Sequence, residues 1–116
     1  FEAQSQREAY TVAVARLYRN YDLLLTPTLP LVAFDAGLEK PVDADLERWC
    51  DWTPFTWPFN LTGQPAASVP CGLTSAGLPA GLQIIGPRYA DALVLRAAQA
   101  YEEVAPFALP PGAGSR

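Results

Sequence analysis

The sequence predicts an α/β protein in which helices cover a small sheet, and three observations carry this prediction. Residues 22–26 form a short unbroken apolar run that stops at a proline, which is typical of a strand covered on both faces. Residues 67–72 and 80–86 are two apolar runs joined by a turn-rich stretch, so they predict an antiparallel pair. Residues 3–20 and 91–105 have the apolar spacing of amphipathic helices. Together these elements predict packed layers of helix and sheet.

The first helix is expected over residues 3–20. Its glutamates lie early and its arginines late, which is the polarity that the helix dipole favours. Its apolar stripe consists of Tyr10, Val14, Leu17, Tyr18 and Tyr21. The last helix is expected to begin at an Asp91 cap and to end at Pro106. The side chains expected on its apolar side are Val94, Ala97, Ala98, Tyr101 and, at its end, Ala105.

The middle of the chain indicates mostly irregular backbone. Residues 27–41 contain three prolines and no periodicity, which predicts a long surface loop. Asp43 can cap a short helix that ends near Pro54. Residues 53–65 are so rich in proline and aromatic residues that neither a regular helix nor an inner strand is expected there. Pro70 lacks a backbone donor, so its nitrogen is expected at an edge or an irregularity of the sheet.

Composition excludes several classes of function. The 116 residues contain no His, so this chain alone cannot form a Ser-His-Asp or Cys-His nucleophile system or a His-ligated metal centre. The formal net charge of −4 argues against capture of nucleic acid or of an anionic membrane surface. The longest aliphatic block spans residues 23–25, far short of the about 20 residues that a membrane helix needs. Cys50 and Cys71 are expected to be reduced, mostly buried thiols of a cytoplasmic protein, with a disulfide between them as the alternative.

Several side chains of types used in catalysis or metal binding are better explained by a surface, turn or capping role. Lys40, the only lysine, lies in an acidic loop beside a proline and is expected at the surface, because this loop offers neither the burial nor the cationic neighbour that a lysine base needs. Ser75 lies in a glycine-flanked turn, but the glycine spacing differs from that of a nucleophile turn. Four acidic residues lack the glycine and closing glutamate of a calcium loop, so capping and a solvated surface explain them better. They are Asp43, Asp45, Glu47 and Asp51. No metal site and no cofactor are expected.

The one dense cluster in the chain is aromatic. Residues 49–59 contain all three tryptophans and two phenylalanines. Such a cluster can form the wall of an apolar substrate pocket, because pockets combine aromatic walls with a few polar groups. It can equally form a plug in the core, and the sequence leaves both interpretations open.

Three blocks of the sequence resemble the C-terminal part of amidase signature enzymes. The blocks are residues 21–28, YDLLLTPT, residues 58–72, PFNLTGQPAASVPCG, and residues 77–86, GLPAGLQIIG. The resemblance covers about residues 5–105, which is about the last quarter of a family member. It implies one part of a large α/β/α sandwich with a mixed sheet, to which this chain contributes a β-hairpin and flanking helices. Residues 1–108 would be the C-terminal segment of the amidase domain, and residues 109–116 a flexible tail.

The resemblance also implies an activity and a candidate site. Amidase signature enzymes hydrolyse carboxamides with two serines and a lysine base from their N-terminal portion, so no catalytic residue is expected in this chain, which alone should be inactive. The segment before Asn60 helps to wall the acyl pocket in such enzymes. Here it supplies the candidate substrate-binding residues Trp49, Trp52, Thr53, Phe55 and Trp57. Amidotransferase A subunits use a carboxylate in this region to hold an ammonium group, so Thr53 indicates an apolar or aromatic amide instead.

The main expectation is therefore a cytoplasmic amidase that converts a small, apolar or aromatic carboxamide into an acid and ammonia or an amine. Its expected partners are the small-molecule amide and further copies of itself as a homo-oligomer, with no direct contact to nucleic acid or membrane. The alternatives are the A subunit of a tRNA-dependent amidotransferase and a non-catalytic oligomerisation or binding module. A piece cut from a large sheet would expose strand edges and apolar faces, so the isolated chain is expected to self-associate or to be unstable.

Overall fold

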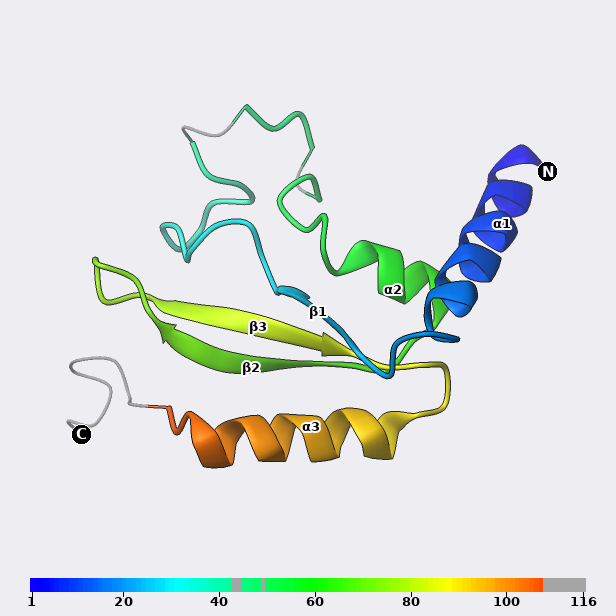
Figure 1. Cartoon of the computed structure of the whole chain (residues 1–116). Coiled ribbons are helices and arrows are strands. Elements are labelled where there is room, and N and C mark those ends of the chain that lie inside the picture. Colours follow the sequence, from blue (N-terminus) through cyan, green and yellow to red (C-terminus); the bar gives the residue numbers. More distant parts are fainter. Residues whose placement is uncertain (43–44, 49, 108–116) are drawn as a thin grey trace.

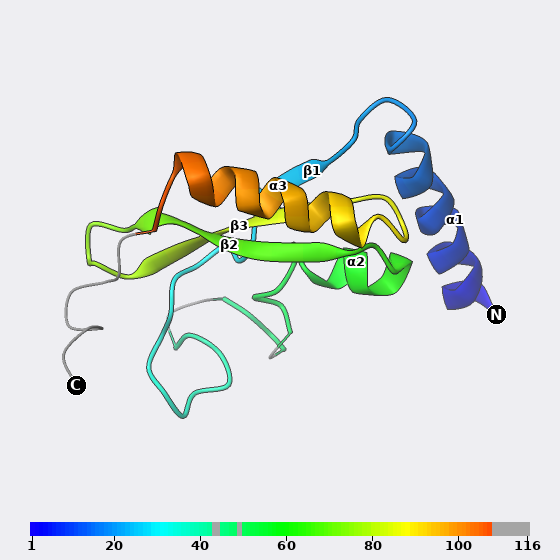
Figure 2. The ribbon, with the colours of Figure 1, turned by 90° about the horizontal axis from the view of Figure 1, so that it is seen from below.

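The computed structural model describes residues 1–42, 45–48 and 50–107. Within them the elements follow in the order α1 (Glu2–Leu17), β1 (Leu24–Pro27), α2 (Trp57–Thr62), β2 (Ala66–Leu73), β3 (Pro79–Ile85) and α3 (Asp91–Val104). Helix α3 lies along one face of the sheet, whereas α2 and the long loop after β1 lie on the other face (Figures 1 and 2). This arrangement confirms the predicted α/β class.

The sheet has β3 at its centre, with β1 on one side and β2 on the other, and both pairings are antiparallel. The β2–β3 pair is the hairpin that the sequence predicts. In the register, Thr26 and Ser68 both lie opposite Gln83, which forms a polar row across the three strands. The register shifts between Pro70 and Leu73 on the outer strand β2. Pro70 therefore lies at an edge and next to an irregularity, as expected from its missing donor.

The helix α2 contradicts the expectation of no regular helix in residues 53–65. It forms because Pro58 lies in its first turn, where a backbone N–H has no partner within the helix and its absence costs little. Gly63 ends the helix in the left-handed conformation, with φ of 73°, which glycine adopts without strain. Prolines near a helix start are compatible with a short helix, so proline density alone was a poor guide here.

Strand β1 also differs from its prediction. It begins at Leu24 instead of residue 22 and ends at Pro27. The side chain of Leu25 is 57% exposed. The described residues of this chain therefore do not cover both faces of the strand, because β1 is an outer strand of the sheet and α3 packs on β2 and β3.

The two long helices lie where the sequence predicts them, with changes at their ends. The N-cap of α3 is Ala90, and Asp91 is the first helical residue, so its carboxylate stabilises the helix through the dipole and does not cap it. Val94 is buried against the sheet, and Ala97, Ala98 and Tyr101 are half-buried. Ala105, which was expected on the same side, is exposed because it follows the last helical residue. Helix α1 buries no residue, because among the described elements it contacts chiefly α2. Arg7 of α1 donates a hydrogen bond of 2.7 Å from its Nε to the carbonyl oxygen of Leu61.

Other predictions fall in the segment between β1 and α2. The predicted loop over residues 27–41 is confirmed apart from Pro27, which still belongs to β1. The helix expected to end near Pro54 is absent from the described residues, which form bends and turns at 45–48 and 50–56; its proposed cap, Asp43, lies outside them. The predicted tail, residues 109–116, also lies outside the described residues.

The described core is small and lies around the sheet. Its buried apolar side chains are Phe59, Ile84, Ile85 and Val94. Both cysteines are free thiols, but only Cys50 is half-buried; Cys71 is exposed, contrary to the burial expected for both, because it lies on the outer strand β2. No helix among the described residues has the length and apolar character needed to cross a membrane.

Candidate functional site

A groove with a volume of about 970 Å³ opens between the sheet and the loop that follows β1. Residues 25–34 form one side of it, and residues from β2 and β3 form the other. None of the described residues that line the groove is charged. Phe34 and Trp52 line it together, and their rings meet edge to face with centroids 5.5 Å apart. The groove is therefore chemically suited to an apolar or aromatic group.

Two side-chain hydroxyl groups form a polar site in the wall of this otherwise apolar groove. The side-chain oxygens of Thr28 and Ser68 lie 2.7 Å apart and share a hydrogen bond. Gly81 lies beneath them, and a Cβ atom there would come within 2.8 Å of Thr28 Oγ1 and 2.9 Å of Ser68 Oγ. The backbone N–H of Thr28 also donates to the Gly81 carbonyl over 2.9 Å. The close approach of the loop to β3 therefore depends on the missing side chain at position 81.

The segment of residues 50–57, which we call the aromatic segment, runs in turns beside this groove. Its local hydrogen bonds join Thr53 Oγ1 to the Cys50 carbonyl over 2.7 Å and Thr56 Oγ1 to the Thr53 carbonyl over 3.2 Å. Trp52 donates from its indole nitrogen to the carbonyl oxygen of Glu39 over 3.2 Å. The segment is thus held by its own turns and by the loop that forms one wall of the groove.

The structure separates the five candidate substrate-binding residues. Trp52 lines the groove. Thr53 directs its hydroxyl to the Cys50 carbonyl, and Phe55 is half-buried. Trp57 begins α2, is 42% exposed and lies outside the lining of the groove. Trp49 lies outside the described residues.

The alternative interpretation of the aromatic cluster, a plug in the core, holds for Phe59. Phe59 of α2 is 8% exposed and belongs to the core, whereas Trp52, Phe55 and Trp57 do not reach that degree of burial. The aromatic cluster of the sequence therefore divides into a core residue and a set of more exposed side chains.

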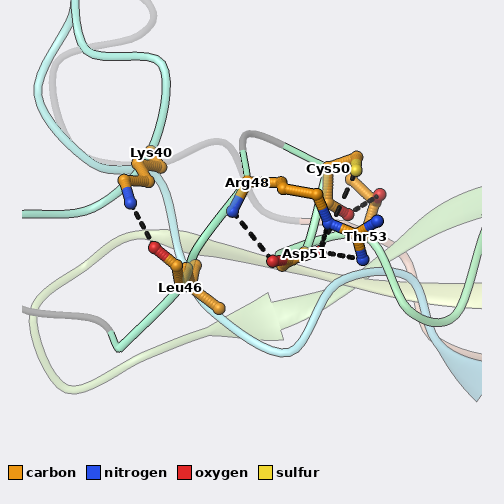
Figure 3. Close-up of polar contacts among 6 residues, drawn as sticks. All are labelled: Lys40, Leu46, Arg48, Cys50, Asp51 and Thr53. Carbon is orange, nitrogen blue, oxygen red and sulfur yellow. Dashed lines mark hydrogen bonds and ion pairs between the residues drawn. The ribbon is translucent and has the colours of Figure 1, made fainter.

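Arg48, Asp51 and Lys40, close to the aromatic segment in the sequence, make polar contacts (Figure 3). Asp51 accepts a 2.9 Å hydrogen bond from the backbone N–H of Arg48, and its other oxygen lies 3.0 Å from the Arg48 guanidinium. The backbone N–H of Arg48, helped by its guanidinium, holds the pKa of Asp51 below its ordinary value. Lys40 is half-buried, not fully exposed as expected, because its ammonium donates to the Leu46 carbonyl. Within the described ranges, no three His, Cys, Asp or Glu side chains are arranged to hold a metal ion.

Comparison with known proteins identifies the family of the chain. The sequence profile of the family described as Amidase matches residues 1–95. The chain belongs to the amidase family. This membership confirms the resemblance drawn from the three sequence blocks.

The relatives of this chain within the amidase family carry more than one name. The A subunit of glutamyl-tRNA(Gln) amidotransferase from Brevibacillus brevis is 43% identical over 108 residues, which cover 91% of this chain and 21% of the relative. The crystal structure of the same subunit from Thermotoga maritima matches with a TM-score of 0.80 and 37% identity, over 93% of this chain and 23% of that one. A bacterial aryl acylamidase, described as an amidase signature enzyme, matches with a TM-score of 0.74 and 35% identity, over 90% of this chain and 22% of that one. The chain spans about a fifth of the length of the curated relatives it matches.

One buried polar residue next to the groove, Gln83, was not predicted from the sequence. It lies on the central strand β3, is 4% exposed, and donates hydrogen bonds to Thr26 and to the Phe55 carbonyl. The available signal was an amide side chain inside the apolar run of residues 80–86. Because buried polar side chains are nearly always hydrogen-bonded, such a residue predicts a tether to another segment, although the sequence does not say to which one.

Proposed function

We propose that this chain is the C-terminal segment of an enzyme that hydrolyses a small apolar or aromatic carboxamide. Water replaces the amide nitrogen at the acyl carbon, so the products are a carboxylic acid and ammonia or an amine. The nucleophile and base that the family resemblance implies lie outside these 116 residues, and the chain contributes to the wall around the substrate. No cofactor is required for this reaction, and the chain alone is expected to be inactive.

The observation that carries this proposal is the uncharged groove with Trp52 and Phe34 in its wall. An apolar pocket binds apolar groups by removing their surface from water, at roughly 25 cal/mol per Å². The hydroxyl pair of Thr28 and Ser68 offers one place for a polar atom of the ligand. A groove of this composition is poorly suited to a charged substrate group, because a charge without a partner is costly to desolvate.

The surroundings of Thr53 support the same proposal. The aromatic segment contains one carboxylate, Asp51, and Arg48 engages both of its oxygens. Thr53 donates its hydroxyl hydrogen to the Cys50 carbonyl within the same segment. The segment therefore presents no unpaired carboxylate for a substrate ammonium.

The second candidate function is that of the A subunit of a tRNA-dependent amidotransferase. The names of the curated relatives favour it, since the first of them are named as the A subunit of glutamyl-tRNA(Gln) amidotransferase. In that case the partners would include a glutamyl-tRNA, in contrast to the small-molecule partner proposed above. The groove and the surroundings of Thr53 favour the first candidate, and the names favour the second.

A comparison of substrates with full-length enzyme separates the two candidates. For the first, the enzyme alone hydrolyses aromatic amides, and Trp52→Ala lowers kcat/KM for a bulky aromatic amide at least about tenfold more than for a small aliphatic amide. Trp57→Ala is the matched control, because this tryptophan lies outside the groove lining. Equal losses for both amides would contradict the pocket role of Trp52. Amide formation on glutamyl-tRNA, without hydrolysis of free aromatic amides, would establish the second candidate.

A further inference from the structure

The buried side chain of Gln83 joins three segments that are far apart in the sequence. Its Nε2 donates to Thr26 Oγ1 over 2.9 Å and to the carbonyl oxygen of Phe55 over 2.8 Å. Thr26 lies 57 residues away on β1, and Phe55 lies 28 residues away in the aromatic segment. One amide group thus connects the centre of the sheet both to an outer strand and to the candidate pocket wall.

The orientation of this amide follows from its partners. The Phe55 carbonyl can only accept a hydrogen bond, so it must face the NH₂ group of Gln83 and not its oxygen. Thr26 Oγ1 donates its own hydrogen to the Pro27 carbonyl over 3.0 Å, so it accepts from Gln83. Both hydrogens of the Gln83 NH₂ group therefore have an acceptor, and rotation of the amide would break both bonds.

The bond to Phe55 acts at the middle of the aromatic segment. Trp52 lies three residues before Phe55 and lines the groove, and its indole nitrogen donates to the Glu39 carbonyl. The turns of residues 50–57 fix the local shape of the segment but not its distance from the sheet. The Gln83 bond supplies a connection to the sheet, from a side chain that is 4% exposed and so has little freedom to move.

We propose that Gln83 is a positioning residue that sets the place of the aromatic segment over the sheet and thereby the selectivity of the enzyme among amides. It acts through the Phe55 backbone and does not touch the substrate. This inference rests on the proposed amidase function for its selectivity part. Its structural part, the tether itself, can be measured without any substrate.

Two variants of the same network test the proposal in the full-length enzyme. Gln83→Met keeps the length of the side chain but removes both donors, so it releases Phe55. Thr26→Val is the matched control for the tether itself, because it removes the bond to β1 and leaves the Phe55 bond in place. If Gln83→Met does not fold, Gln83→Asn replaces it, since an amide shortened by one methylene group cannot reach both acceptors.

The first measurement is hydrogen exchange of the backbone amides in residues 50–57. Gln83→Met is expected to speed their exchange at least about tenfold relative to Thr26→Val, because a segment without its tether opens more readily. The second is the ratio of kcat/KM between an aromatic and a small aliphatic amide, which Gln83→Met should change at least about fivefold. Because Thr26 itself lines the groove, the control for this ratio is Leu95→Ala, which should change it less than about twofold: Leu95 is 65% exposed on α3 and lies outside the groove lining. Equal exchange in both variants, or faster exchange with an unchanged ratio, would overturn the proposal. Faster exchange in an enzyme that hydrolyses no free amide would support the tether and refute the proposed function.

Discussion

The contact between Gly86 and Val94 allows a quantitative test of how α3 packs against the sheet. A Cβ atom at position 86 would lie 2.7 Å from Val94 Cγ2, and Val94 is 2% exposed. Valine in a helix has one strongly preferred χ1, so it cannot turn away easily. The φ of Gly86 is not among the positive values, so alanine can adopt its backbone conformation. Gly86→Ala is therefore expected to lower the free energy of unfolding by about 1–3 kcal/mol through overpacking alone.

The companion substitution Val94→Ala removes two buried methyl groups. Their transfer contributes about 1.6 kcal/mol, at about 0.8 kcal/mol each, and the cavity left behind raises the loss to about 2–3 kcal/mol. In the double variant the new methyl group at position 86 occupies space that Val94 Cγ2 has left. The clash disappears and the cavity shrinks, so the double variant should be more stable than the sum of the two losses predicts, by at least about 1 kcal/mol.

Urea unfolding of the full-length enzyme measures this double-mutant cycle, provided that all variants share one m-value. Gly86→Ala combined with Leu95→Ala is the control, because Leu95 is 65% exposed on the same helix. That pair should be additive within about 0.5 kcal/mol. Additivity in the Gly86 and Val94 pair as well would refute the packing of α3 described above.

Two further predictions concern the groove and the charged turn. Gly81→Ala should lower the free energy of unfolding by about 1–3 kcal/mol, because its methyl group displaces the Thr28 and Ser68 hydroxyls. The same displacement should lower kcat/KM for bulky amides. An unchanged thermal unfolding temperature would contradict the close approach of the loop to β3. The lowered pKa of Asp51 means that its ionised carboxylate stabilises the turn at pH values above the ordinary carboxyl range, and this contribution is lost as the pH falls through the lowered pKa. In a ¹³C titration of Asp51, Arg48→Ala should raise that pKa only in part, because the backbone N–H at position 48 remains; a full return to the ordinary value would show that the guanidinium alone is responsible.

Local pattern in the sequence predicted most of the fold. The apolar period of α3 and the turn between β2 and β3 are encoded within a few residues, and both lie where they are predicted. Helix α2 was missed because a proline is a helix breaker in the interior but is favourable in the first turn, and the sequence around Pro58 does not say where a helix would start.

The candidate site was predicted less completely, for a different reason. Trp52 was selected from the aromatic cluster, and it does line the groove. The pairing of Thr28 with Ser68 and the bonds of Gln83 depend on the register between distant strands, which no local window contains. The roles at the substrate of all five candidates stay predictions; they are Trp49, Trp52, Thr53, Phe55 and Trp57.

The central position of β3 determines when the pocket wall can form during synthesis. Since β1 and β2 pair with β3 and not with each other within the described residues, neither strand has its partner from this segment until β3 has left the ribosome. The nascent chain up to residue 78 therefore carries the aromatic segment without its connection to Gln83 and the loop without Gly81 to close against. Long-range pairing of this kind is slow relative to local helix formation. The aromatic segment and the loop after β1 are consequently expected to take their places in the groove only after β3 has been synthesised.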